Sequence, residues 1–106
     1  MKIGYTNNKI KKNCDLARKK WGTQLGGKVL QRLAELAAFN TLADVPHQPP
    51  QRCHQYEGNA YRFSVDLTAN FRLIFMPAEP FEVKEGIGIV KESVKAIIIL
   101  SVEDPH

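Results

Sequence analysis

The sequence of 106 residues has no hydrophobic run near the roughly 20 residues that a membrane-spanning helix requires. Its first residues, Met-Lys-Ile-Gly-Tyr-Thr, lack the apolar core of a secretory signal peptide. There is no internal repeat and no low-complexity tract. We therefore expect a cytoplasmic protein made of one domain, residues 1–106, because a chain of this length supports a single core.

Cysteine is scarce, since the chain has only Cys14 and Cys53, and they lie in different segments without the spacing of metal ligands. We expect both to be reduced thiols. A metal site built from these two residues and His54 is disfavoured, because adjacent residues of a strand point to opposite faces. The sequence therefore predicts neither a metal nor any other cofactor.

Acidic residues are nearly absent from the first third of the chain. Residues 1–32 hold nine of the fifteen lysines and arginines and one acid, Asp15, whereas residues 77–106 hold three basic and six acidic residues. A basic region of this kind indicates binding to a polyanion or to an acidic protein surface. The alternative is a solvated lysine-rich helix that only keeps the protein soluble, and charge alone does not choose between them.

Apolar periodicity predicts two helices, Asn8–Lys20 and Thr23–Phe39, which form an antiparallel pair because only Gly22 breaks the pattern between them. A short edge strand over residues 2–5 comes before them. A single helical turn is expected at residues 41–45, before Pro46.

The stretch from Tyr61 to Met76 predicts a β-hairpin, because apolar and polar residues alternate up to Leu67. The apolar face would hold Tyr61, Phe63, Val65 and Leu67, and the polar face Arg62, Ser64 and Asp66. A three-residue loop, Thr68-Ala69-Asn70, with Asn70 in the left-handed conformation, would set Asp66 opposite Arg72.

Two more strands are expected, at residues 52–57 and at Val94–Val102, with an insertion at residues 77–89. The last strand contains Ala-Ile-Ile-Ile-Leu in succession, which is typical of an inner strand buried on both faces. The expected fold class is α+β, with the N-terminal helical hairpin packed on one face of a small, mostly antiparallel twisted sheet.

Four stretches, in this order and spacing, carry a resemblance to a known family: Arg32-Leu33-Ala34-Glu35-Leu36, Arg52-Cys53-His54-Gln55-Tyr56-Glu57-Gly58-Asn59, Asn70-Phe71-Arg72-Leu73-Ile74-Phe75 and Glu103-Asp104-Pro105-His106. The chain resembles the plasmid-maintenance killer proteins, HigB-like toxins of the RelE/ParE superfamily. The resemblance covers nearly the whole chain.

The resemblance implies a RelE-like fold and a type II toxin that associates with the ribosome, cleaves messenger RNA without a metal and so inhibits translation. Its implied partners are a cognate antitoxin, a small helix-turn-helix protein, together with messenger RNA and the ribosome. No membrane is implied, and a second copy of the chain is a further candidate partner. The residues around the scissile phosphate map to His54, Arg72, Asp104 and His106.

These residue types fit RNA cleavage, which needs a base for the 2′-hydroxyl proton, a cation for the phosphorane and an acid for the leaving oxygen. His54 and His106 suit either proton role, Asp104 would orient His106 if the last strand continues, and Arg72 suits the phosphate. The alternatives are a strand-surface His54, a frayed terminal His106 and an Arg72 that pairs only with Asp66.

The remaining basic residues are interpreted as an RNA- or ribosome-binding surface that contacts phosphates. This surface comprises Lys9, Lys11, Lys12, Lys19, Lys20, Lys28, Arg32 and, beside the hairpin, Arg62.

Two other functions remain open. One is a non-enzymatic toxin that inhibits a topoisomerase, as ParE-like members do. The other is a degenerate member that only binds its antitoxin, because Pro105 stands where killer proteins commonly have an aromatic residue, and proline neither stacks on a base nor donates a hydrogen bond.

Overall fold

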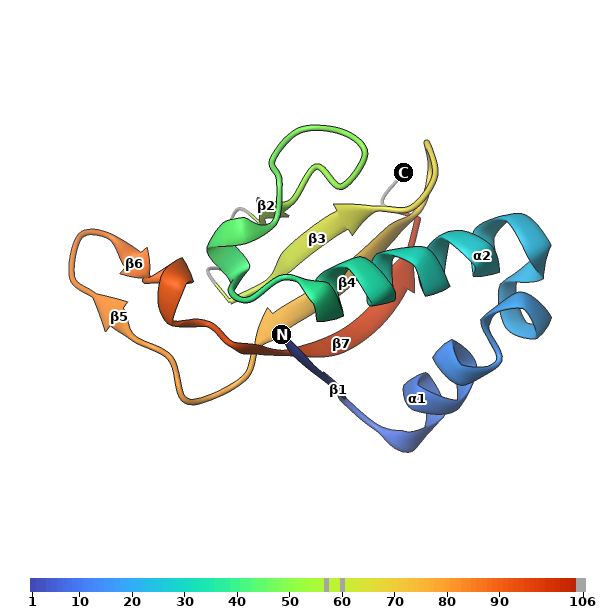
Figure 1. Ribbon diagram of the computed structural model, residues 1–106, viewed down its shortest axis with the longest axis horizontal. Coiled ribbons are helices and arrows are strands. Elements are labelled where there is room, and N and C mark those ends of the chain that lie inside the picture. The colour runs from blue at the N-terminus through green and yellow to red at the C-terminus, as the bar shows by residue number, and fades with distance from the viewer. Residues whose placement is uncertain (57, 60, 105–106) are drawn as a thin grey trace.

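The computed structural model describes residues 1–56, 58–59 and 61–104, in which two helices pack on a mostly antiparallel sheet (Figure 1). This confirms the α+β class. The elements in chain order are β1 (Lys2–Tyr5), α1 (Asn8–Asp15), α2 (Ala17–Ala38), the 3₁₀ turn η1 (Leu42–Asp44), β2 (His54–Gln55), β3 (Phe63–Asp66), β4 (Arg72–Pro77), β5 (Val83–Lys84), β6 (Gly88–Ile89), the 3₁₀ turn η2 (Lys91–Ser93) and β7 (Ala96–Glu103).

The main sheet has the strand order β1-β7-β4-β3-β2, and only β1 and β7 run parallel. β7 is an inner strand, as predicted. Burial on both of its faces was predicted too, but only one face is fully buried. Ile97 and Ile99 are inaccessible to solvent, whereas Ile98 and Leu100 on the other side are half-buried.

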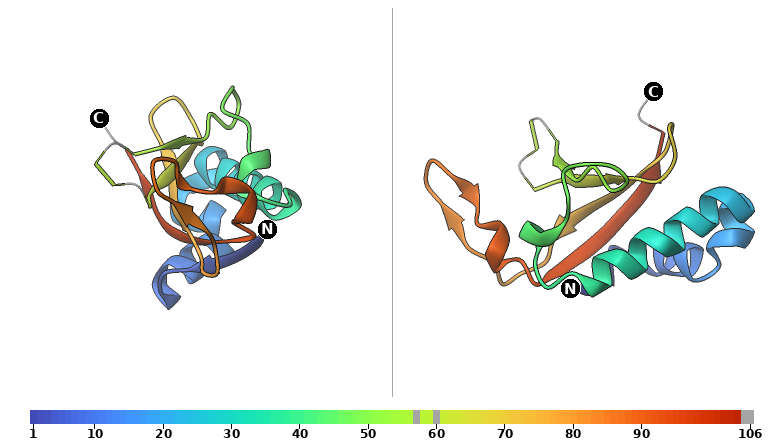
Figure 2. Two further views of the ribbon diagram at one scale, coloured as in Figure 1. Left: turned by 90° about the vertical axis from the view of Figure 1, so that its left-hand side faces the viewer. Right: turned by 45° about the horizontal axis from the view of Figure 1, so that its top comes forward.

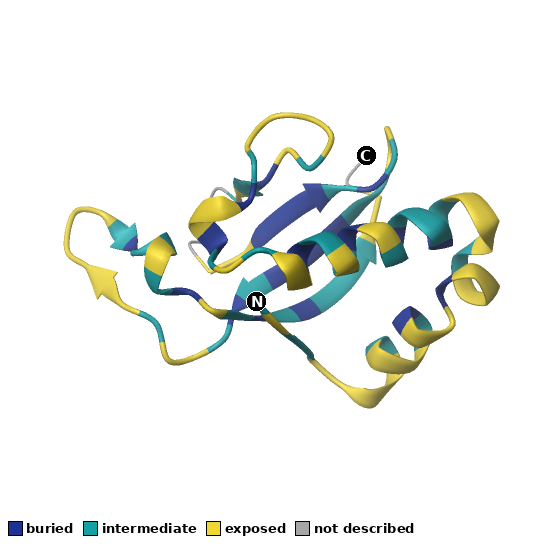
Figure 3. Ribbon diagram, viewed as in Figure 1, coloured by how far each residue is buried: buried dark blue, intermediate teal, exposed yellow. Residues whose placement is uncertain are grey.

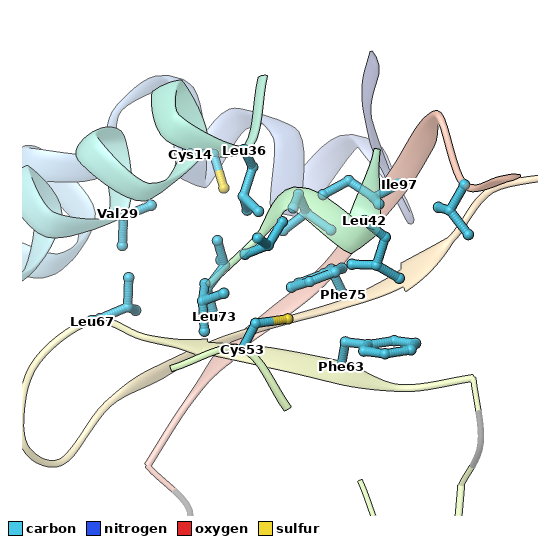
Figure 4. Close-up of a cluster of buried hydrophobic side chains, with 14 of the residues drawn as sticks. Cys14, Val29, Leu36, Leu42, Cys53, Phe63, Leu67, Leu73, Phe75 and Ile97 are labelled. Atoms are coloured by element: carbon cyan, nitrogen blue, oxygen red, sulfur yellow. The ribbon is translucent and has the colours of Figure 1, made fainter. Parts of the chain in front are cut away.

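Both helices cover the same face of the sheet, and the hydrophobic core lies between these two layers (Figures 1 and 3). Leu36 of α2 and Leu73 and Phe75 of β4 are among the buried side chains of this core (Figure 4). No helix of the described residues lies on the opposite face, which we call the outer face (Figure 2). That face can therefore present side chains to a ligand.

The helical region differs from its prediction in one respect. The predicted first helix, Asn8–Lys20, ends at Asp15, because Leu16 leaves the helical conformation with φ −114° and ψ 40°. The predicted break at Gly22 is confirmed, since its φ of 85° interrupts α2. Apolar spacing cannot reveal the break at Leu16, because the apolar stripe continues through it.

Gly26 explains how the helical segments fold against one another. A Cβ atom on Gly26 would lie 2.4 Å from the carbonyl oxygen of Ala17, far inside van der Waals contact. Only a residue without a side chain lets the two backbones approach so closely. The chain thus turns at Gly22 and closes on itself at Gly26.

The β3–β4 hairpin forms as predicted, with Asp66 opposite Arg72 and a loop at residues 68–70. The Leu67 N–H donates to the Phe71 carbonyl at 2.9 Å, which closes the loop. Asn70 is not left-handed, because the only non-glycine residue with positive φ among those described is Arg52. Tyr61 lies before β3 and is 44% exposed, so it is not part of the buried face.

The predicted strand at residues 52–57 is short, because only His54–Gln55 pairs with β3. Residue 57 lies outside the described residues. The segment after β4 contains a second two-stranded sheet, β5–β6, which the sequence did not predict and which projects from one end of the molecule (Figure 2). Neither helix within the described ranges is long and apolar enough to cross a membrane.

Candidate functional site

Strand register aligns polar residues from four strands on the outer face of the sheet. His54 of β2 lies opposite Ser64 of β3, and Arg72 of β4 lies between Asp66 of β3 and Glu103 of β7. Because side chains alternate along a strand, these residues point away from the helices. The outer face is therefore the candidate site.

His54 rests on the buried hydroxyl of Ser64. The Ser64 Oγ lies 3.4 Å from Nδ1 and 3.3 Å from Nε2 of the imidazole, and Nδ1 is 3.3 Å from the Arg52 carbonyl. The ring is stacked on that of Tyr56, with centroids 6.1 Å apart. Neutral histidine has one donor and one acceptor nitrogen, so these neighbours can hold one tautomer while the ring stays half-exposed.

Asp66 lies between two arginines. Its Oδ2 is 2.7 Å from Arg52 Nε, and its Oδ1 is 3.5 Å from Arg72 Nε. Oδ1 is buried and has no hydrogen-bond partner within the described part of the chain, so the Arg72 contact is an ion pair without hydrogen-bond geometry. The carboxylate thus holds two guanidinium groups on the same face of the sheet.

Arg52 was missed by the sequence prediction. It comes before β2 and reaches Asp66 because its φ of 44° places it in the left-handed region, which arginine rarely adopts. Its side chain is 46% exposed. Residue spacing gives no signal for this placement, because the left-handed backbone at Arg52 breaks the alternation of an extended strand.

His54 and Arg72 share the outer face without being neighbours. Ser64 separates them across the sheet, and Arg72 is two residues from Ile74, the partner of Ser64. Ordinary strand spacing then puts their Cα atoms about 12 Å apart. A ligand that contacts both residues would have to lie across β3 and β4.

The predicted tail of the site is only partly described. Asp104 is exposed and follows Glu103, the last residue of β7. Both Pro105 and His106 lie outside the described residues. Glu103, which the sequence analysis did not single out, is instead the cross-strand partner of Arg72 and accepts a hydrogen bond from Ser101.

The predicted binding surface is exposed at most of its positions. The exposed ones are Lys9, Lys11, Lys12, Lys19, Lys20 and Arg62, and Lys28 is half-buried. Lys11 pairs with Asp15 at 2.7 Å.

Arg32 is a correction, because its side chain is buried and cannot form part of a surface. Its Nε donates to the Asp66 carbonyl at 2.8 Å, and its terminal nitrogens contact Glu35 and the Pro50 carbonyl. The arginine therefore joins α2 to the hairpin and to the loop before β2. It lies behind Asp66 and supports the candidate site from the helical side.

The described residues contain two buried thiols and no cluster of candidate metal ligands. No group of three or more His, Cys, Asp or Glu residues with metal-site geometry occurs in residues 1–56, 58–59 and 61–104. Cys14 and Cys53 are buried free thiols, and burial raises the pKa of each to about 11. Neither is available as a thiolate near neutral pH.

The arrangement can bind an anion and move a proton. The two guanidinium groups at Asp66 match the geometry of phosphate oxygens, and the His54 imidazole has one nitrogen that can donate and one that can accept a proton when neutral. Comparisons of the chain with protein-family models, with curated proteins and with solved structures gave no match.

Proposed function

We propose that the chain is the toxin of a type II toxin–antitoxin system, with a RelE-like fold, and that it is a metal-independent endoribonuclease acting on messenger RNA at the ribosome. It would act in the cytoplasm and be held inactive by a small helix-turn-helix antitoxin. The observation that carries this proposal is the shared outer face of His54, Arg72 and Arg52. It combines a proton-transfer group with two phosphate-binding groups.

The proposed reaction is attack of a 2′-hydroxyl on the adjacent phosphorus. One bond forms between the 2′-oxygen and phosphorus, and the bond from phosphorus to the 5′-oxygen breaks, which leaves a cyclic phosphate and a 5′-hydroxyl end. His54 takes one of the two proton-transfer roles, and His106 is the candidate for the other. Arg72 stabilises the charge that gathers on the phosphorane.

Asp66 positions the arginines in this proposal. A guanidinium held through Nε can still offer its terminal nitrogens to a phosphate. The two guanidinium charges face two carboxylates, Asp66 and the cross-strand partner Glu103, so binding of a phosphodiester would come from directed hydrogen bonds of the arginines and not from an excess of positive charge.

The test is to induce the chain in bacterial cells and map the 5′ ends of transcripts. We expect new 5′ ends within messages and arrested translation. Arg72→Ala and His54→Ala should each reduce cleavage by about 10²- to 10³-fold, the usual cost of losing one group that stabilises a transition state. Lys84→Ala removes a positive charge from the exposed hairpin β5–β6 and is the matched control.

Two outcomes would contradict the proposal. Intact transcripts with a supercoiling defect would support a topoisomerase inhibitor instead. Cleavage that survives in both the Arg72 and His54 variants would show that these residues do not carry the activity.

A further inference from the structure

An apolar hollow lies at the end of the molecule that carries β5 and β6. Its volume is about 760 Å³, and it lies against Met76 of β4 and Ile98 of β7. Tyr61 and Val83 at its walls are 44% and 54% exposed. The other lining residues are Pro77, Glu79, Pro80 and Phe81.

The hollow is bordered by acidic side chains. Glu79 lines it directly, and a neighbouring hollow that shares Pro80 and Phe81 is lined by Glu82 and Glu92 as well as by Lys95. An RNA strand fits this surface poorly, because carboxylates repel its phosphates. A complementary ligand would carry an apolar group flanked by positive charges.

The same chain presents such a group at its other end. Leu16, at the break between α1 and α2, is 47% exposed, and it shares a surface depression with Lys12, Lys19 and Lys20. A single exposed leucine is ordinary. The leucine lies beside three lysines, whereas the apolar hollow is lined by Glu79 and adjoins a second hollow lined by Glu82, Glu92 and Lys95. The two surfaces are therefore complementary in apolar character and in net charge.

We propose that a second copy of the chain docks here, with the Leu16 surface of one copy packed against the apolar hollow of the other. Lys12, Lys19 and Lys20 then face Glu79, Glu82 and Glu92. The two surfaces lie at opposite ends of a molecule 42 Å long (Figure 1), so they meet between copies and not within one. The contact is heterologous, since each copy contributes a different patch. This proposal does not depend on ribonuclease activity.

The first experiment is sedimentation velocity of the full chain over a range of concentrations and at two salt concentrations. We expect association that weakens as salt rises, because exposed charges are screened. Leu16→Asp and Val83→Asp should each weaken association by about tenfold or more, the usual effect of losing one buried aliphatic side chain. Ile87→Asp is the matched control, because Ile87 is 74% exposed and does not line the hollow.

The decisive experiment mixes the two weakened variants. The Val83→Asp chain keeps its Leu16 surface, and the Leu16→Asp chain keeps its hollow, so the mixture should form one-to-one complexes that neither variant forms alone. Three results would each overturn the proposal: a chain that stays monomeric at every concentration, variants that associate like the unmodified chain, or a mixture that associates no better than its components. Both substitutions are at exposed positions, and thermal unfolding verifies that the folds are intact.

Discussion

Arg32 connects three parts of the molecule through a single buried side chain. It donates to the backbone carbonyl of Asp66, contacts the Pro50 carbonyl, and pairs with Glu35 at 3.1 Å. The sequence predicted Arg32 to lie on a binding surface together with the lysines. The sequence does not distinguish a buried arginine from an exposed one, because two of the acceptors of its guanidinium come from segments that meet α2 only in the folded chain.

Replacing Arg32 should therefore lower stability without acting through RNA contacts. We expect Arg32→Met to reduce the free energy of unfolding by about 2–4 kcal/mol, because carbonyl acceptors and Glu35 would lose a charged donor. Urea denaturation measures the change. Arg18→Met, at an exposed position of α2, should change it by less than about 0.5 kcal/mol, and equal losses in both variants would rule out the structural role.

The buried thiols predict a specific pH dependence. Burial raises the pKa of Cys53 from 9.0 to about 11, so the unfolded chain loses this proton first as pH rises. The contribution to stability is complete below about pH 9 and declines as pH rises through 11. Denaturation at several alkaline pH values should show this decline, and the decline should be smaller in Cys53→Ala.

The burial of both thiols also predicts their reactivity. A thiol reagent at pH 8 should react slowly with the folded chain and quickly with the chain unfolded in urea. Rapid reaction of the folded chain would contradict the burial of both thiols.

Among the elements, the helical hairpin depends on a pair of adjacent glycines with different roles. An added Cβ at Gly26 would meet the Ala17 backbone at 2.4 Å, whereas at Gly27 its nearest contact would be the flexible Arg18 side chain at 4.0 Å. Only the first glycine is required by packing.

Alanine substitutions should separate these roles. Gly26→Ala should destabilise the protein by about 1–3 kcal/mol through overpacking. Gly27→Ala should stabilise it by up to about 1 kcal/mol, because alanine is the better helix former. Thermal unfolding measures the change in stability for each substitution. If both changes have the same sign, the close approach of Gly26 to the Ala17 backbone is refuted.

The helices and the β3–β4 hairpin were predictable because each is set by local periodicity. Phe63, Val65 and Leu67 alternate with polar residues, and the short loop fixes the register that pairs Asp66 with Arg72. The break at Leu16 and the small sheet β5–β6 were not predictable. The break at Leu16 is a local backbone conformation that leaves no trace in residue spacing. The sheet β5–β6 is a local hairpin around Gly86, with strands of two residues each, which is too short to show a periodic pattern.

The candidate site was predictable only in part for the same reason. His54 and Arg72 were found through the resemblance, and the sheet aligns both on the outer face. Arg52 was missed because its contact with Asp66 depends on a left-handed backbone at its own position. Glu103 was missed because its place opposite Arg72 depends on the register between β4 and β7.

At the scale of the whole molecule, charge is separated along the long axis. The lysines of α1 and early α2 lie at one end, and the acidic segment around β5 and β6 lies at the other (Figure 1). If the proposed function holds, the first end binds RNA phosphates and the second does not.

Salt dependence of RNA binding tests this separation. For a single-stranded oligonucleotide with 2′-O-methyl groups, which prevent cleavage, the slope of log K against log salt changes by about 0.7 per phosphate contact. The double variant Lys19→Gln, Lys20→Gln should reduce the slope by about 1.4. The control is the double variant Lys84→Gln, Lys95→Gln at the acidic end, which should leave the slope unchanged. Equal changes of slope in the two double variants would indicate that net charge alone attracts the RNA.

The central place of β7 determines when the fold can form during synthesis. Lys2 of β1 pairs with Ala96, and β4 pairs with β7 along its length, so β1 and β4 share a neighbour that the ribosome makes after both. Contacts between such distant parts of the chain form late and slowly. A nascent chain that ends before residue 96 lacks β7, the strand that joins β1 to β4. It also lacks Glu103, the partner of Arg72 on β7. If the proposed function holds, a growing chain cannot assemble the candidate site before β7 has been made.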